Sequence, residues 1–209
     1  MAKSLKSAPA LAAGVRTRRA YFDCKFGQLH VRTAFPGTGG FDEQVTLVCL
    51  HGQRASSRSF ARFLPEIGDV RSVYAPDLPG CGESDPSPSG NATEAASAIL
   101  DLARDLRLRQ IDVLGLEWGA AVAVELGATQ PELVRRLVLI ALPAERLPVA
   151  KQPSLILRTK MDAPDSTGRA KAALPGAKFL DALDYAEDLF DAAPKTLAKD
   201  IGGYLSGRI

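Results

Sequence analysis

The chain has 209 residues, 46% of them hydrophobic, and a formal net charge of +2 at neutral pH. This length is enough to bury one substantial core and too little for two, so we expect a single domain. The longest apolar runs, such as Arg136 to Pro143, are far shorter than the roughly 20 residues of a membrane-spanning helix, which argues against a membrane partner.

The N-terminal segment is basic: residues 1–19 carry five basic side chains and no acidic one. The short apolar patch Ala8 to Val15 is followed by arginines rather than by small residues, which is the wrong order for a secretory signal. We predict a disordered tail over residues 1–19, with a targeting or docking role left open, and one domain over residues 20–209. Nucleic acid is not an expected partner, because no aromatic or groove-reading motif accompanies the basic residues.

Two strands are predicted at the start of the domain. Tyr21–Lys25 and Leu29–Ala34 flank Phe26-Gly27-Gln28, in which Gly27 can supply the positive φ that a tight turn needs. The pattern predicts an antiparallel hairpin.

Apolar runs separated by helical sequence follow the hairpin and predict buried parallel strands. The predicted strands are Gln44–Leu50, Val70–Tyr74, Gln110–Leu114, Arg136–Ala141, Ser154–Arg158 and Ala177–Ala182. The predicted helices are Ser57–Leu64, Ala92–Leu106, Trp118–Thr129, Ser166–Ala173 and Pro194–Leu205, with Asn91 or Thr93 and Asp191 as caps. This alternation predicts an α/β fold with a mostly parallel, doubly wound sheet of about eight strands.

Three cysteines, Cys24, Cys49 and Cys81, have neither CxxC nor metal-ligand spacing. An odd number of such cysteines is typical of reduced thiols, and we expect a cytoplasmic protein.

Four landmarks occur in a fixed order, each at the end of a predicted strand, and together they resemble the α/β-hydrolase superfamily. They are Leu50-His51-Gly52-Gln53, Asp77-Leu78-Pro79-Gly80-Cys81-Gly82-Glu83-Ser84-Asp85, Gly115-Leu116-Glu117-Trp118-Gly119 and Lys160-Met161-Asp162. Members of this superfamily usually insert a cap domain after the strand that ends here near Ile140. The short, proline-containing segment before Ser154 cannot form a long helix, so the resemblance implies a cap that is absent or minimal.

The third landmark resembles a nucleophile elbow, a sharp strand-to-helix turn that needs small residues beside the nucleophile. Gly115 and Gly119 meet that need, and Glu117 stands at the apex. Similar esterases have Ser at this position, whereas epoxide hydrolases and haloalkane dehalogenases have Asp. Glu117-Trp118-Gly119 is most similar to the Asp-Trp-Gly form.

The resemblance also implies a catalytic acid at Asp162 and a histidine in a Gly-His-x-x-x-x-x-x-Pro pattern. Here the corresponding stretch, Ala186 to Pro194, places Glu187 at the histidine position. A shift of one or two residues in this alignment would place Asp184, Tyr185 or Asp188 there instead.

Only two histidines are present in the chain, and neither is expected to act as a base on Glu117. We interpret His30 as a surface strand residue, and His51 as a buttress of the oxyanion loop that also lies at the substrate-binding edge.

Backbone N–H groups of Gln53 and Trp118 are the predicted oxyanion donors, and Trp118 can also line a substrate pocket. Glu117, Asp162 and Glu187 are the predicted catalytic residues. Carboxylates that share a small site can divide into one protonated and one ionised group, which is usable acid–base equipment.

Three hypotheses remain open at this level. The first is a hydrolase-like or lyase-like enzyme that acts on a small organic substrate by carboxylate chemistry, without a cofactor. The second is an inactive pseudo-hydrolase that binds a small ligand or another protein, with Glu117 or Glu187 neutralised by Arg54 or Arg58 as one variant. The third, a carboxylate-bound metal, has little support because the acids are dispersed and no histidine joins them; a homo-oligomer is left open.

Overall fold

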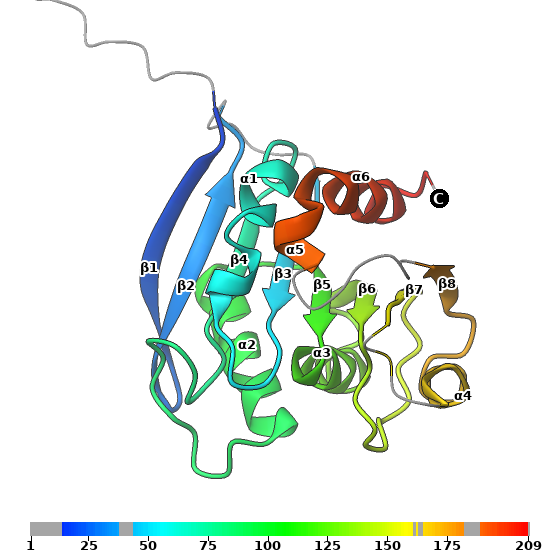
Figure 1. Cartoon of the computed structure of the whole chain (residues 1–209). Coiled ribbons are helices and arrows are strands. Elements are labelled where there is room, and N and C mark those ends of the chain that lie inside the picture. The colour runs from blue at the N-terminus through cyan, green and yellow to red at the C-terminus, as the bar shows by residue number, and fades with distance from the viewer. Residues whose placement is uncertain (1–13, 38–43, 161, 163–164, 182–188, 209) are drawn as a thin grey trace, which may run out of the picture.

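The computed structural model describes residues 14–37, 44–160, 162, 165–181 and 189–208. One eight-stranded sheet runs through it in the order β1-β2-β4-β3-β5-β6-β7-β8 (Figure 1). The strands are β1 Arg16–Cys24, β2 Gly27–Phe35, β3 Thr46–Leu50, β4 Val73–Pro76, β5 Ile111–Leu116, β6 Val134–Ile140, β7 Ser154–Arg158 and β8 Lys178–Asp181. The pairs from β4 to β8 are parallel, and the β1–β2 hairpin is antiparallel, so the predicted sheet is confirmed.

The hairpin starts earlier than the sequence indicates. Arg16–Arg19, which we assigned to the tail, lie in β1, where Arg16 pairs with Phe35 and Arg19 with Arg32. The sequence pattern did not indicate a strand here because β1 is an edge strand, and its charged residues are mostly exposed to solvent instead of forming an apolar run. Residues 1–13 of the predicted tail lie outside the described part of the chain.

Helices cover both faces of the sheet, with α1, α5 and α6 on one face and α2, α3 and α4 on the other (Figure 1). They are the short 3₁₀ helix η1 Ser57–Phe60 and α1 Phe63–Ile67, α2 Ala92–Asp105, α3 Trp118–Thr129, α4 Ser166–Ala173, α5 Leu189–Ala192 and α6 Pro194–Leu205. Each helical layer packs its own apolar cluster against the buried strands, so both faces of the sheet are covered.

The predicted single helix Ser57–Leu64 is wrong, because the chain forms η1 and then restarts as α1. A single helix that ran from Ser57 to the observed end of α1 at Ile67 would carry Pro65 in its interior, where the ring lacks an N–H and clashes with the preceding turn. Restarting at Phe63 places Pro65 in a first turn, where it is tolerated.

Of the predicted helix caps, Asn91 is confirmed and Asp191 is wrong. Asn91 caps α2, because its Oδ1 accepts a hydrogen bond from the N–H of Glu94 at 2.9 Å. Asp191 is not a cap: it lies inside α5, and α6 begins after Ala193 with Pro194 at its first position. Proline suits this position because its missing N–H would have no intrahelical acceptor there.

The connection from β6 to β7 is short, as expected for a protein without a cap. Residues 141–153 are all described and contain no helix or strand. In the described part of the chain, no helix is both long and apolar enough to cross a bilayer.

Candidate functional site

The turn between β5 and α3 has the geometry of a strained elbow. Glu117 has φ 51° and ψ −116°, a conformation that costs a non-glycine residue about 1–3 kcal/mol. Its N–H donates to the carbonyl of Ile140 at 2.9 Å, and its carbonyl accepts from the N–H of Ala120 at 2.9 Å. The neighbouring strand and the first helical turn therefore hold the apex in place.

Two glycines make this turn sterically feasible. A Cβ on Gly119 would lie 2.2 Å from the carbonyl oxygen of Leu50, and one on Gly115 would lie 2.5 Å from Cα of Ala120. Backbone atoms cannot yield at such distances, so β3, β5 and α3 approach this closely only where side chains are absent. This explains the Gly-x-Glu-x-Gly spacing in physical terms.

The Glu117 carboxylate lies over the loop that follows β3. A Cβ added to Gly52 would lie 2.3 Å from Oε2, so this oxygen lies against the loop that carries Gln53, one of the two predicted oxyanion donors. The carboxylate also stands at the N-terminus of α3, where the helix dipole favours negative charge.

No described residue forms an ion pair with Glu117. The alternative in which Arg54 or Arg58 neutralises this carboxylate therefore has no support in the described part of the chain.

Each predicted oxyanion donor is next in sequence to a residue of this contact: Trp118 follows Glu117, and Gln53 follows Gly52. Trp118 is the first residue of α3, and the N–H of a first helical residue has no intrahelical acceptor. Gln53 is exposed in the turn after β3. The assignment of both N–H groups to an oxyanion hole stays a prediction, as does a substrate contact of the Trp118 ring.

His51 is a structural link between two loops. It is fully buried, its Nδ1 donates to the carbonyl of Gly52 at 2.7 Å, and the N–H of Leu78 donates to its Nε2 at 2.9 Å. These contacts require a neutral ring and support the predicted buttress role. They leave no ring nitrogen for a substrate, which corrects the expectation that His51 binds one.

Acid should weaken the fold through His51. Burial lowers the pKa of its ring below the ordinary 6.5, although the Gly52 carbonyl and Asp77 act in the opposite direction. The unfolded chain therefore takes up this proton first as the pH falls, so the contribution is complete above 6.5 and is lost below it. We expect the free energy of unfolding, measured with urea, to decline from about pH 7 to about pH 5, and a His51→Gln variant to show a shallower slope. Equal slopes in both proteins would contradict this assignment.

Asp162 lies beyond the end of β7, on the same edge of the sheet as Glu117, with β6 between their strands. The N–H of Thr159 donates to its Oδ2 at 2.8 Å. Burial raises the pKa of this carboxyl, while Thr159 and Arg158 oppose the increase. The Asp162 carboxyl is therefore protonated more readily than that of an exposed aspartate. Glu187, the third predicted acid, lies outside the described residues.

His30 was misinterpreted from the sequence, because it is buried rather than exposed. Its side chain is 2% exposed, and Nδ1 lies 2.9 Å from Oδ2 of Asp77. Asp77 also accepts from the N–H groups of Ser57 at 2.6 Å and Glu83 at 2.9 Å. Burial raises the pKa of Asp77, but the hydrogen bonds from Ser57, Glu83 and His30 together lower it by more, so the net shift is downward.

Strand alternation could not reveal this pair, since the residues are far apart in sequence. Both histidines of the chain are thus engaged by partners other than Glu117. In the described residues, no group of three or more His, Cys, Asp or Glu side chains is arranged to hold a metal ion.

Comparisons with known proteins agree with this architecture. A family model described as "Alpha/beta hydrolase family" matches residues 47–207. An uncharacterized hydrolase of Bacillus subtilis (strain 168) is 30% identical over 97 residues, covering 46% of this chain and 36% of that protein. The soluble epoxide hydrolase of Corynebacterium sp. (strain C12) is 30% identical over 95 residues, covering 45% and 33%.

The solved structure of a protein described as a "predicted CIB-like hydrolase" from Thermoplasma acidophilum has the same fold, with a TM-score of 0.80, 18% identity and coverage of 93% of this chain and 100% of that chain. The chain spans about a third of the length of the curated relatives it matches.

Proposed function

Because the chain belongs to the alpha/beta hydrolase family, we propose that it is a hydrolase of small electrophilic organic molecules with the Glu117 carboxylate as its nucleophile. Epoxides are the first class to consider, since one relative is a soluble epoxide hydrolase and the elbow carries a carboxylate rather than a hydroxyl.

One observation carries the proposal: the chain holds a carboxylate, unpaired within the described residues, at a strained elbow. The strain at Glu117, with φ 51°, is a cost that a merely structural turn could avoid with glycine. The position of its Oε2 against Gly52 points the nucleophile toward the loop of Gln53.

The first chemical step forms a glutamyl ester. One carboxylate oxygen of Glu117 bonds to an epoxide carbon while the ring C–O bond breaks, and the resulting alkoxide takes a proton from an acid. Asp162 is our candidate for that acid, because burial raises its pKa and favours the protonated form.

The second step hydrolyses the ester and restores both groups. The Asp162 carboxylate accepts a proton from water as the water oxygen attacks the ester carbonyl carbon. The backbone N–H groups of Gln53 and Trp118 stabilise the oxyanion that forms. Collapse breaks the ester C–O bond and releases the diol, which takes up the proton of the new carboxyl, so Glu117 is again ionised and Asp162 again protonated. Glu187 remains an alternative base.

Mass spectrometry in heavy-oxygen water tests this sequence. The protein is incubated with epoxide, haloalkane, ester and hydroxy-acid panels, and the peptide that contains Glu117 is weighed after a single turnover. We expect heavy oxygen in that peptide, because water attacks the glutamyl ester rather than the substrate carbon. Turnover without heavy oxygen in Glu117 would exclude the covalent route and favour acid–base lyase or general-base chemistry.

A second candidate, an inactive binding protein, is favoured by a different observation. Both histidines of the chain are hydrogen-bonded to residues other than Glu117, and a carboxylate is a weaker base than imidazole at neutral pH. Absence of turnover across all four panels, in protein shown to be folded, would favour this candidate.

A further inference from the structure

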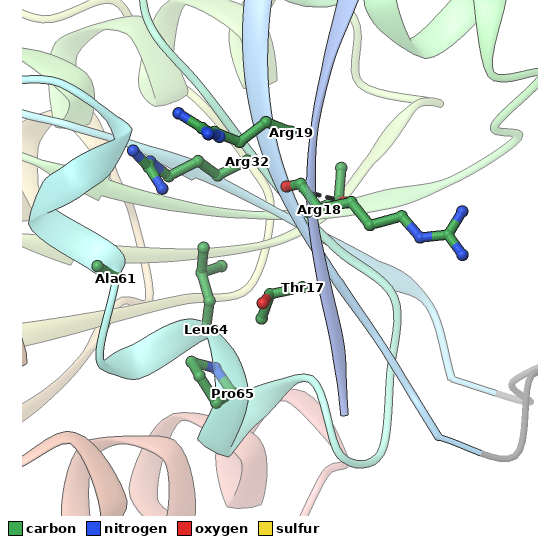
Figure 2. Close-up of a pocket in the computed structure, with 8 residues that line it drawn as sticks. Thr17, Arg18, Arg19, Arg32, Ala61, Leu64 and Pro65 are labelled. Carbon is green, nitrogen blue, oxygen red and sulfur yellow. Dashed lines mark hydrogen bonds between the residues drawn. The ribbon is translucent and has the colours of Figure 1, made fainter. Parts of the chain in front are cut away.

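A cavity of about 520 Å³ lies between the β1–β2 hairpin and the segment that includes α1, in a part of the molecule not used by the proposed chemistry (Figure 2). Arg18, Arg19 and Arg32 are among the residues that line it on the hairpin side, and Leu64 and Pro65 line it on the helical side. The cavity therefore combines a basic wall with an apolar one.

The basic wall is formed by two arginines that face each other across the hairpin. Arg19 and Arg32 are direct partners in the β1–β2 register, and their side chains lie side by side, whereas Arg18 extends the other way (Figure 2). Like charges placed directly opposite on neighbouring strands repel each other and destabilise the pair. A bound anion would turn this repulsion into attraction.

The described part of the chain supplies no carboxylate that forms an ion pair with either arginine, although the pKa of the Glu83 carboxyl is lowered first by the hydrogen bond from Tyr21 and also by the charge of Arg19. Neither Arg19 nor Arg32 forms an ion pair with a described residue. Nε of Arg32 is buried and has no hydrogen-bond partner there. The carboxylate of the nearby Glu83 accepts instead from the hydroxyl of Tyr21 at 2.7 Å. A buried donor without an acceptor is costly, and an anion bound in this cavity would supply the acceptor.

A neighbouring cavity of about 280 Å³ shares Arg32 with the first. His30 lines it, is 2% exposed, and has a buried Nε2 without a partner among the described residues. The Nδ1 of the same ring is engaged by Asp77. Nε of Arg32 and Nε2 of His30 are thus two buried nitrogens without a partner among the described residues, on side chains that line two cavities sharing Arg32.

We propose that Arg19 and Arg32 bind the phosphate group of a small organic phosphate, whose apolar part packs against Leu64 and Pro65. Two guanidinium groups match the two charges of a phosphate monoester, and each planar guanidinium can donate two parallel hydrogen bonds to its oxygens. A carboxylate would carry half this charge and offer fewer acceptors.

Isothermal titration calorimetry at constant ionic strength tests the site, with phenyl phosphate as probe and benzoate as its carboxylate match. We expect Arg19→Gln and Arg32→Gln each to weaken phenyl phosphate binding by about tenfold or more, because each removes a charge-assisted donor pair. The matched control is Arg18→Gln. Arg18 also lines the cavity, but its side chain extends away from Arg19 and Arg32 (Figure 2), so removing its charge should change affinity less than about twofold. Melting temperatures verify that each variant is folded.

Three results would overturn the proposal. The first is that the wild-type protein does not bind phenyl phosphate at concentrations up to about 10 mM. The second is that Arg18→Gln weakens binding as much as the other two variants, which would indicate a general basic surface. The third is that benzoate binds more tightly than phenyl phosphate. None of these outcomes depends on turnover at Glu117.

Discussion

Turnover is expected to fall by a factor on the order of 10⁴ or more when Glu117 is replaced by Gln, the scale seen when a covalent nucleophile is removed. The amide keeps the size of the side chain but loses its charge and its nucleophilic oxygen pair. The strained backbone at φ 51° and the contacts of the elbow with Ile140 and Ala120 should persist. We therefore expect kcat to be lost while the melting temperature stays close to that of the wild type.

The measurement is kcat/KM on whichever panel the wild-type protein turns over, with circular dichroism to confirm folding. Glu132→Gln is the matched control, because it makes the same change at an exposed position away from the elbow. A Glu117→Gln variant that keeps activity within about tenfold of the wild type would show that this carboxylate is not the nucleophile.

A related variant, Glu117→Ser, tests whether the site contains a general base that can activate a serine nucleophile. Serine needs a general base to become nucleophilic, and both histidines bind elsewhere: His51 contacts Gly52, and His30 contacts Asp77. No esterase should result. Strong esterase turnover by this variant would contradict the inference that the site lacks an imidazole base.

Asp112→Ala is expected to destabilise the fold by about 3–5 kcal/mol, the range for breaking a buried ion pair by removing one partner. Asp112 and Arg71 are both fully buried, with Nη1 of Arg71 donating to the carboxylate at 3.2 Å. Arg135 donates to the same carboxylate through Nε at 2.9 Å and Nη2 at 2.6 Å. Removing the carboxylate leaves a buried guanidinium without the charge that balances it.

The same network fixes the end of α6, because Nη2 of Arg135 also donates to the carbonyl of Leu205 at 2.8 Å. Denaturant unfolding measures the loss, and Asp181→Ala is the comparison. The latter breaks the ion pair between Arg158 and Asp181, whose side chains are 41% and 53% exposed, and should cost no more than about 1 kcal/mol. A loss below about 1 kcal/mol for Asp112→Ala would contradict the assigned role of the network.

Much of this protein follows from local sequence. Buried strands appear as short apolar runs, and α3, α4 and α6 begin and end at the residues that the pattern predicts. The elbow was predictable for the same reason: Gly115 and Gly119 are needed by a turn that lies within a few residues of Glu117. The break between η1 and α1 also has a local cause, because Pro65 is tolerated in the first turn of α1 but not inside a longer helix.

Contacts between distant segments decided the rest. The burial of His30 depends on Asp77, which lies 47 positions away, and the burial of Arg71 depends on Asp112, which lies 41 positions away. A strand pattern states which residues share a face, but not which loop or helix covers that face. The sequence alone therefore determined the fold and the identity of the elbow carboxylate. Only the tertiary structure decided which histidines, arginines and acids meet, because charge and hydrogen-bond partners are chosen by proximity in space rather than by spacing along the chain.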